Sequence, residues 1–243
     1  MNKEKKLRIA AVGDIHYTKH CKGRLEPLFT EVSAAADVLL LCGDLTDHGL
    51  VEEANILAED IHTHLKIPAI GVVGNHDFES GQVEELMVVL ENGGMRILDG
   101  ECTEVEHVGF AGVCGFGGGF GKRMLNAWGE PIIKSFVQEA VDQALKLEKA
   151  IGQLHSRVRV GVLHYSPIRD TVEGESEEIF PFLGSSRLEQ PIDQFGLQAV
   201  FHGHAHAGRP EGKTATNVPV YNVALPLLKK TQPKGPDYKL LSL

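Results

Sequence analysis

Apolar runs and helix-patterned stretches alternate along the first 92 residues of the chain. Three runs rich in β-forming residues are typical of buried strands, and they span residues 7–13, 37–43 and 67–74. Each run is followed by a segment that we predict to be helical, at residues 24–36, 51–65 and 82–92. This alternation of strand and helix predicts a parallel sheet with helical crossovers.

The pattern changes after residue 94. Short strand signals at 95–98, 102–107 and 108–114 lie close together in the chain, which predicts antiparallel pairing rather than crossovers. Residues 131–154 keep a helical period throughout, and a further short helix is expected from about 186 to 195. We expect the remaining strands at 157–163, 198–201, 218–224 and 238–241. Residues 165–186 show no clear period, and a loop of this length in a compact domain is usually functional or mobile.

Composition limits the class of protein. The 243 residues, of which 42% are hydrophobic, are enough for one domain spanning residues 1–243 with a sizeable core. The net charge of -9 makes nucleic acid an unlikely partner without excluding it, because bound divalent metals can supply positive charge. No apolar run approaches bilayer length and the polar start does not resemble a signal peptide. The four scattered cysteines suit a reducing compartment, so we expect a cytoplasmic protein.

Five polar motifs each follow an apolar, strand-like run. They are Asp14-x-His16, Gly43-Asp44-x-x-Asp47, Gly74-Asn75-His76-Asp77, His164 and Gly203-His204-x-His206. Any one of these residues alone would more often be a turn, a cap or a surface group. Together, at the carboxyl ends of strands where α/β proteins bind ligands, they predict a metal site. Carboxylate, amide and imidazole donors suit Mn, Fe or Zn rather than Cu(I).

Asp44 is central to this hypothesis. It stands where the strand 37–43 ends and a loop begins. A carboxylate at that position can reach two metal ions, one through each oxygen. We therefore expect Asp44 to bridge two metals and the other motifs to converge on it.

With these motifs in order, the sequence resembles the calcineurin-like metallophosphoesterase family. The resemblance covers residues 14–206 and matches every position of the family signature. It implies an α/β fold, a four-layer α/β/β/α sandwich of two mixed β-sheets flanked by helices. It also implies two divalent ions, one held by Asp14, His16, Asp44 and His206 and the other by Asp44, Asn75, His164 and His204. His76 corresponds to the family's catalytic histidine, and Asp77 would orient it. Asp47 would not bind a metal itself but would hold the metal ligands in position.

A mechanism follows from this arrangement. Two metals about 3.5–4 Å apart can share a water and lower its pKa toward neutrality. The resulting hydroxide would attack phosphorus in line, while the metals neutralise charge on the phosphoryl oxygens. His76 would stabilise that charge or protonate the leaving oxygen.

The expected activity is hydrolysis of a phosphodiester or phosphomonoester of a small molecule such as a cyclic nucleotide, with a slight preference for diesters. A phosphoprotein phosphatase is the enzyme alternative, but its relatives usually carry arginine before the GNH motif, where this chain has Val73. A non-catalytic scaffold with the same fold is the alternative from another class. Relatives of that kind tend to lose ligands or the catalytic histidine, and this chain retains both.

Three further residues are candidates for substrate binding. Arg123 follows the glycine-rich loop 115–121, which could cradle a phosphate, although a plain flexible connection is the favoured interpretation of that loop. Ser185 and Arg187 stand where a helix is expected to begin, and helix N-termini attract anions, although simple capping is favoured. His48 and His202 match no family ligand; either could line the cleft, but a structural role is the favoured interpretation for both. The substrate, the metal pair and the oligomeric state stay open.

Overall fold

The three apolar runs at the start of the chain form the centre of one β-sheet. The computed structural model describes residues 6–243. In the first sheet the strand order is β11-β1-β2-β3-β4. Strands β1 to β4 are parallel and β11 joins antiparallel to β1, so the sheet is mixed. Its strands are β1 (Arg8–Val12), β2 (Val38–Cys42), β3 (Ala69–Val72), β4 (Met95–Ile97) and β11 (Lys239–Ser242).

A second sheet is built from the later part of the chain, in the order β5-β6-β7-β8-β10-β9. Strands β6, β7, β8 and β10 are parallel, and β5 and β9 are antiparallel edge strands. Its strands are β5 (Glu101–Val105), β6 (Val108–Val113), β7 (Val158–Leu163), β8 (Ala199–His202), β9 (Glu211–Lys213) and β10 (Pro219–Asn222). This sheet is mixed as well.

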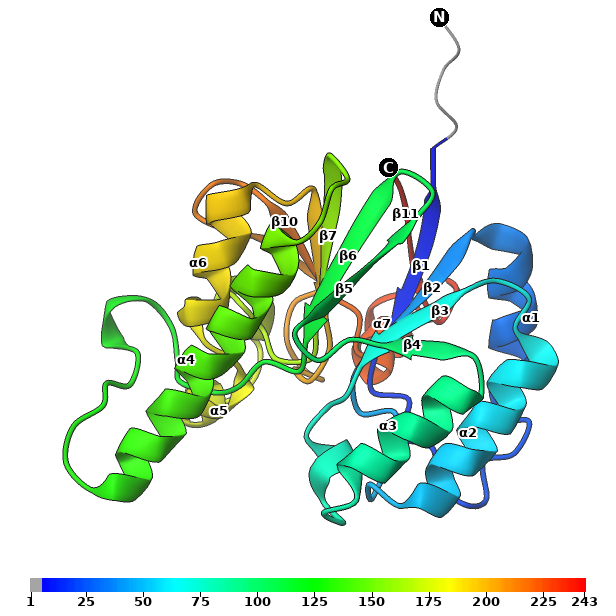
Figure 1. Ribbon diagram of the computed structural model, residues 1–243, viewed down its shortest axis with the longest axis horizontal. Helices are drawn as coiled ribbons and strands as arrows, with labels where there is room; N and C mark the ends of the chain where they lie inside the picture. Colours follow the sequence, from blue (N-terminus) through cyan, green and yellow to red (C-terminus); the bar gives the residue numbers. More distant parts are fainter. Residues whose placement is uncertain (1–5) are drawn as a thin grey trace, which may run out of the picture.

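Helices cover the outer faces of the two sheets (Figure 1). On the first sheet lie α1 (Glu26–Ala35), α2 (Val51–His64) and α3 (Val83–Asn92), and on the second lie α4 (Pro131–Gly152) and α6 (Ser186–Phe195). The short helices α5 (Phe180–Leu183) and α7 (Leu225–Thr231) lie in connections. The inner faces share one hydrophobic core, in which side chains of both sheets are fully buried. The predicted four-layer α/β/β/α sandwich is therefore confirmed.

One predicted pairing is wrong. Residues 95–98 were expected to pair antiparallel with the strands after them, but β4 lies parallel to β3 in the first sheet. The reason is α3, which returns the chain along the face of the sheet and acts as a crossover. Only the next pair, β5 and β6, is antiparallel as expected.

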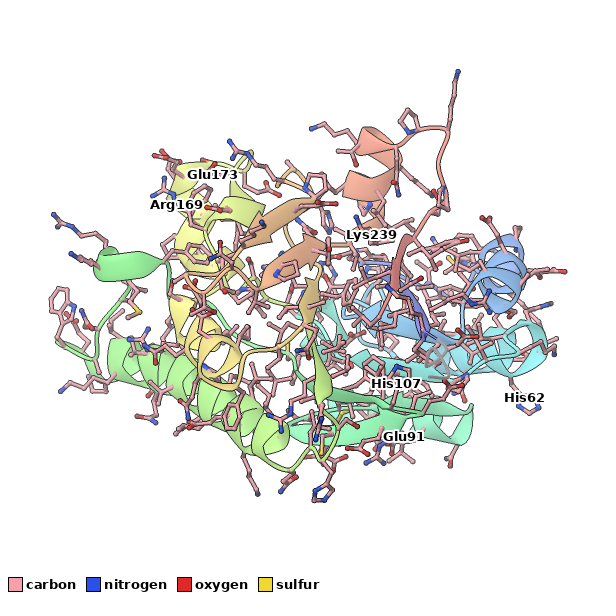
Figure 2. All side chains as sticks on the ribbon, turned by 90° about the horizontal axis from the view of Figure 1, so that it is seen from above. His62, Glu91, His107, Arg169, Glu173 and Lys239 are labelled. Carbon is pink, nitrogen blue, oxygen red and sulfur yellow. The ribbon has the colours of Figure 1, made fainter. Side chains whose placement is uncertain are left out.

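The segment 165–186 is not an irregular loop. It contains α5 and the 3-10 turns Asp170–Val172 and Glu177–Ile179. One of its acidic side chains is held by two ion pairs, because Glu173 lies 3.8 Å from Arg169 and 2.8 Å from Arg209. Figure 2 shows Arg169 and Glu173 together at the edge of the molecule. The segment is therefore anchored to the chain that follows the GHxH motif.

Besides α5, two further elements were not predicted from sequence, β9 and α7. Strand β9 has three residues with a mostly polar pattern, and the second residue of α7 is a proline, which is typical of a break in helical structure. No helix in the described chain, residues 6–243, combines the length and apolar character that a bilayer crossing requires.

Candidate metal centre

The sequence motifs end neighbouring strands, and their backbones share an uncommon conformation. Asp14, His16, Asp44 and His204 all have positive φ, between 43° and 68°. A non-glycine residue with positive φ is strained, and such strain is concentrated at functional sites. The turns aim these side chains into the space between the carboxyl ends of the two sheets' central strands.

Two glycines of the motifs make this crowding sterically feasible. A Cβ atom at Gly74 would collide with the backbone N and Oδ1 of Asp44, and one at Gly203 would collide with Oδ2 of Asp14. Both positions therefore need glycine because a carboxylate passes against the backbone.

Asp14 anchors one half of the site. Its buried carboxylate accepts hydrogen bonds from the backbone N–H of His204, at 3.0 Å to each oxygen. Nε2 of His206 lies 2.8 Å from Oδ1 of Asp14. Asp14, His16 and His206 each offer one ligand atom, and these atoms lie within 4.8 Å of one another. A single cation could contact all three side chains.

His164 anchors the other half. Its Nδ1–H donates to the carbonyl oxygen of Cys42 at 3.0 Å, which directs Nε2 toward Oδ1 of Asn75 at 2.9 Å. Asp44, His164 and His204 form a second cluster with ligand atoms within 4.8 Å. A hydrogen bond from one ring nitrogen to a carbonyl is the usual support of a metal-binding histidine.

His204 has the same kind of support. Its Nε2–H donates to the carbonyl oxygen of Phe182 at 3.1 Å, which leaves Nδ1 as the free electron-pair donor. Phe182 belongs to α5, so the segment 165–186 helps to orient this ring. This partner was not foreseen, because a backbone carbonyl carries no signal in the sequence.

Asp44 lies between the two halves. Its Oδ1 is 3.4 Å from Nε2 of His164, and its Oδ2 is 3.8 Å from Nε2 of His16. The carboxylate therefore faces one imidazole of each cluster through a different oxygen. This is the position that a bridging ligand would occupy.

The donor set fits divalent cations. In the neutral tautomer fixed by Cys42, the lone pair on Nε2 of His164 faces the oxygens of Asn75 and Asp44. Electron-pair donors at these distances repel one another unless a cation lies between them. Nδ1 of His16 is also buried without a hydrogen bond. The residues present therefore suit the metal ions that the motifs imply.

His76 lies at the rim of this cluster. Its Nδ1 is 2.7 Å from the carbonyl oxygen of Asp47, and its Nε2 is 4.0 Å from Oδ2 of Asp44. Its ring packs edge-on against His16, with centroids 4.6 Å apart. The carboxylate of Asp47 also lies 3.3 Å from Nδ1 of His16, so Asp47 contacts two rings of the site.

The structure does not bring Asp77 to the ring of His76. The fully buried carboxylate of Asp77 accepts four hydrogen bonds, from the backbone N–H groups of Leu45, Thr46 and Gly74 and from the hydroxyl of Thr46. It therefore joins the loop after β2 to the loop after β3. The contact that orients the ring of His76 comes from the carbonyl of Asp47 instead. The hydrogen bonds of Asp77 hold the backbone next to Asp44.

The histidines of the site differ in the direction in which their pKa values are shifted. Burial, followed by the charge of His164, lowers the pKa of His204 to about 4, so its ring is neutral near pH 7. The hydrogen bond to Asp14 raises the pKa of His206 despite partial burial. For His76, burial acts to lower the pKa, but the Asp47 carbonyl and the nearby carboxylates of Asp44 and Glu79 outweigh it and raise the pKa. His76 therefore retains a proton to higher pH than an ordinary histidine.

The three candidate substrate contacts lie together, apart from the clusters. Oγ of Ser185 accepts from the N–H of Arg187, which is the capping role, and Arg187 donates to the carbonyl of Leu125 at 2.7 Å. Arg123 lies in the neighbouring 3-10 turn Gly121–Arg123. The described contacts do not join these side chains to the metal-site residues. Of the two histidines expected to be structural, His202 is buried and uses both ring nitrogens, toward Gly203 and Thr171.

Comparison with known proteins decides the family. The model of the calcineurin-like phosphoesterase family matches residues 7–208. The chain belongs to this family. It is a metal-dependent phosphoesterase by family, and the matched segment contains all five motifs.

Three proteins to which the chain is similar share little sequence identity with it. An uncharacterized protein of Methanocaldococcus jannaschii is 24% identical over 219 residues, covering 89% of this chain and 88% of its own. The crystal structure of phosphopantetheinyl hydrolase from Mycobacterium tuberculosis is similar with a TM-score of 0.67 and 13% identity, covering 98% of this chain and 96% of that one. A putative 5'-nucleotidase from Staphylococcus aureus has a TM-score of 0.53 and 14% identity, covering 89% of this chain and 48% of that one. At these identities the structures show a shared fold.

Proposed function

We propose that this chain hydrolyses a phosphate ester of a small molecule, using two divalent metal ions that share Asp44. The observation that carries the proposal is the position of Asp44, whose two oxygens face His164 and His16 from separate clusters. The expected ligands are Asp14, His16, Asp44, Asn75, His164, His204 and His206. Ions bound there would supply Lewis acidity for the phosphoryl oxygens and a water of lowered pKa.

The residues of the chain provide the remaining chemistry. Asp47 fixes the ring of His76 through its carbonyl, so that Nε2 faces the site. Since Nδ1 is hydrogen-bonded to that carbonyl, Nε2 is the ring nitrogen that would donate a proton to the leaving oxygen, and the raised pKa of His76 favours the protonated ring. His204 and His164 stay oriented through Phe182 and Cys42.

We place phosphodiesters before monoesters as substrates. The rim beside His76 carries the carboxylates of Asp47 and Glu79, with Oε1 of Glu79 3.4 Å from Nδ1 of His76. A diester bears one negative charge, whereas a monoester bears about -1.5 to -2 near pH 7. The acidic rim therefore disfavours the monoester more strongly. Mn, Fe and Zn are all compatible with the oxygen and nitrogen donors.

The test is hydrolysis of bis-p-nitrophenyl phosphate by metal-free protein resupplied with Mn²⁺, Fe²⁺ or Zn²⁺, each with and without chelator. We expect turnover that depends on added metal and disappears with chelator. A protein that binds the metals but hydrolyses neither this diester nor p-nitrophenyl phosphate with any of them would instead be a scaffold.

A further inference from the structure

A cavity of about 350 Å³ adjoins the metal centre, and Asn75 is part of its wall. Three aromatic side chains line it, those of Phe78, Phe116 and Tyr165. Its volume is at the lower end of small-molecule pockets, about 300–1,000 Å³. It therefore has room for one small ring system rather than for a protein segment or a nucleic-acid strand.

The rings on one side of the cavity are fixed by packing against one another. Tyr165 follows His164 in the chain and lies with its centroid 4.5 Å from that of His204. Phe116 lies 5.9 Å from Tyr165 and 4.8 Å from Phe136, centroid to centroid. This side of the cavity is a preformed apolar wall that begins at the metal centre.

Phe78 differs from the other two rings because it is 48% exposed. It comes two residues after His76, and no ring contact joins it to another aromatic residue of the described chain. A large exposed aromatic side chain beside a catalytic cluster is typical of a surface that a ligand covers.

A polar pair lines the same cavity. The Gln143 side chain is buried and fully used, because its Oε1 accepts from the N–H of Gly115 at 3.1 Å and its Nε2–H donates to Oε1 of Glu139 at 2.9 Å. Glu139 is thereby held in one orientation, and it forms no ion pair within residues 6–243. The cavity thus has a positioned carboxylate that can only accept hydrogen bonds when ionised.

We propose that this cavity binds the nucleobase of a nucleotide ester, with the ring against Phe78 and Phe116 and its N–H edge toward Glu139. The inference rests on the proposed function, and it names the substrate class. Guanine fits best because two adjacent N–H groups of its edge can reach one carboxylate, whereas uracil offers one N–H between two carbonyl oxygens. An alkyl chain would fit the rings but has no N–H group to donate to the Glu139 carboxylate.

Binding of guanosine to the metal-free protein, measured by calorimetry or saturation-transfer NMR, tests the cavity without turnover. Phe78→Ala removes an exposed ring and leaves the core intact, and base stacking of this kind predicts a loss of affinity of about 5- to 100-fold. Glu139→Gln should lower the ratio of guanosine to uridine affinity about tenfold. Val88→Ala, an exposed apolar position on α3 outside the cavity, is the matched control and should change neither value.

Turnover gives the second measurement, with guanosine 2',3'-cyclic phosphate compared with the ring-free glycerol 1,2-cyclic phosphate. We expect kcat/KM to favour the guanosine ester, and Phe78→Ala to reduce that preference. Guanosine binding that depends on Phe78 in a protein without turnover would support the cavity while the proposed function fails. Metal-dependent hydrolysis of both esters at equal kcat/KM, with no guanosine binding, would overturn the nucleobase assignment and leave the phosphoesterase intact.

Discussion

Nδ1 of His76 lies 2.7 Å from the carbonyl oxygen of Asp47, and this contact determines which ring nitrogen can act on a substrate. Since a carbonyl only accepts, Nδ1 carries the hydrogen and Nε2 faces Asp44. At 4.0 Å from that carboxylate, Nε2 lies about as far from Oδ2 as Nε2 of His16 does at 3.8 Å, and His76 also offers a ligand atom within 4.8 Å of those of His16 and Asp47. The correspondence of His76 to the catalytic histidine of the family, rather than this distance, predicts that it moves a proton and does not bind a metal.

His76→Gln is accordingly expected to keep both metals and to lose turnover. General acid catalysis contributes about 10²–10⁴-fold, so kcat should fall by that factor. Metal content by mass spectrometry and kcat on the preferred ester are the two measurements. Loss of a metal in this variant would show that His76 is a ligand.

We expect that a substitution in one cluster removes the metal of that cluster and leaves the metal of the other in place. Asp14→Ala should reduce binding in the cluster with His16 and His206, and Asn75→Ala should reduce binding in the cluster with His164. Each variant should retain close to one equivalent of metal after exhaustive dialysis. Retention of both metals in both variants would contradict the assignment of these residues as ligands.

Metal affinity should rise with pH through the pKa of His206. A protonated imidazole cannot bind a metal, and the pKa of His206 is raised by its hydrogen bond to Asp14. His204, whose pKa is lowered to about 4, stays unprotonated over the same range. Titration with Mn²⁺ between pH 5 and 8 should thus show the Asp14 cluster weakening first as pH falls. Equal weakening of both clusters would argue against this order.

Asp77→Asn is expected to destabilise the metal-free fold by about 2–4 kcal/mol. Each carboxylate oxygen of Asp77 accepts two hydrogen bonds, and the amide group would place N–H donors against the backbone N–H groups at one of them. Urea unfolding of the metal-free protein measures the change. The control is Asp99→Asn, which removes an exposed ion pair to Lys146 and should change stability by less than about 0.5 kcal/mol. Equal effects in the two variants would mean that Asp77 does not join the loops.

Much of the fold and site could be predicted because both depend on local patterns. Buried strands appear in the sequence as apolar runs, and each motif follows one of them. Strand β2, for example, places Asp44 at the carboxyl end of the sheet. The direction of β4 could not be read from spacing, since it depends on how α3 packs on the sheet. The partners of His76 and His204 were missed because they are the carbonyls of Asp47 and Phe182, which any residue could supply. Asp77 looked catalytic from its place beside His76, but three of the four donors around it come from Leu45 and Thr46, about 30 residues earlier in the chain.

The most direct test of the account is the metal content of Asp44→Asn beside that of the unaltered protein, both loaded with Mn²⁺ and dialysed under the same conditions. The unaltered protein should bind two ions per chain, and Asp44→Asn should bind fewer than one and lose phosphoesterase turnover, because one side chain serves both clusters. Two tightly bound ions and full turnover in Asp44→Asn would contradict the shared carboxylate on which the proposed chemistry depends.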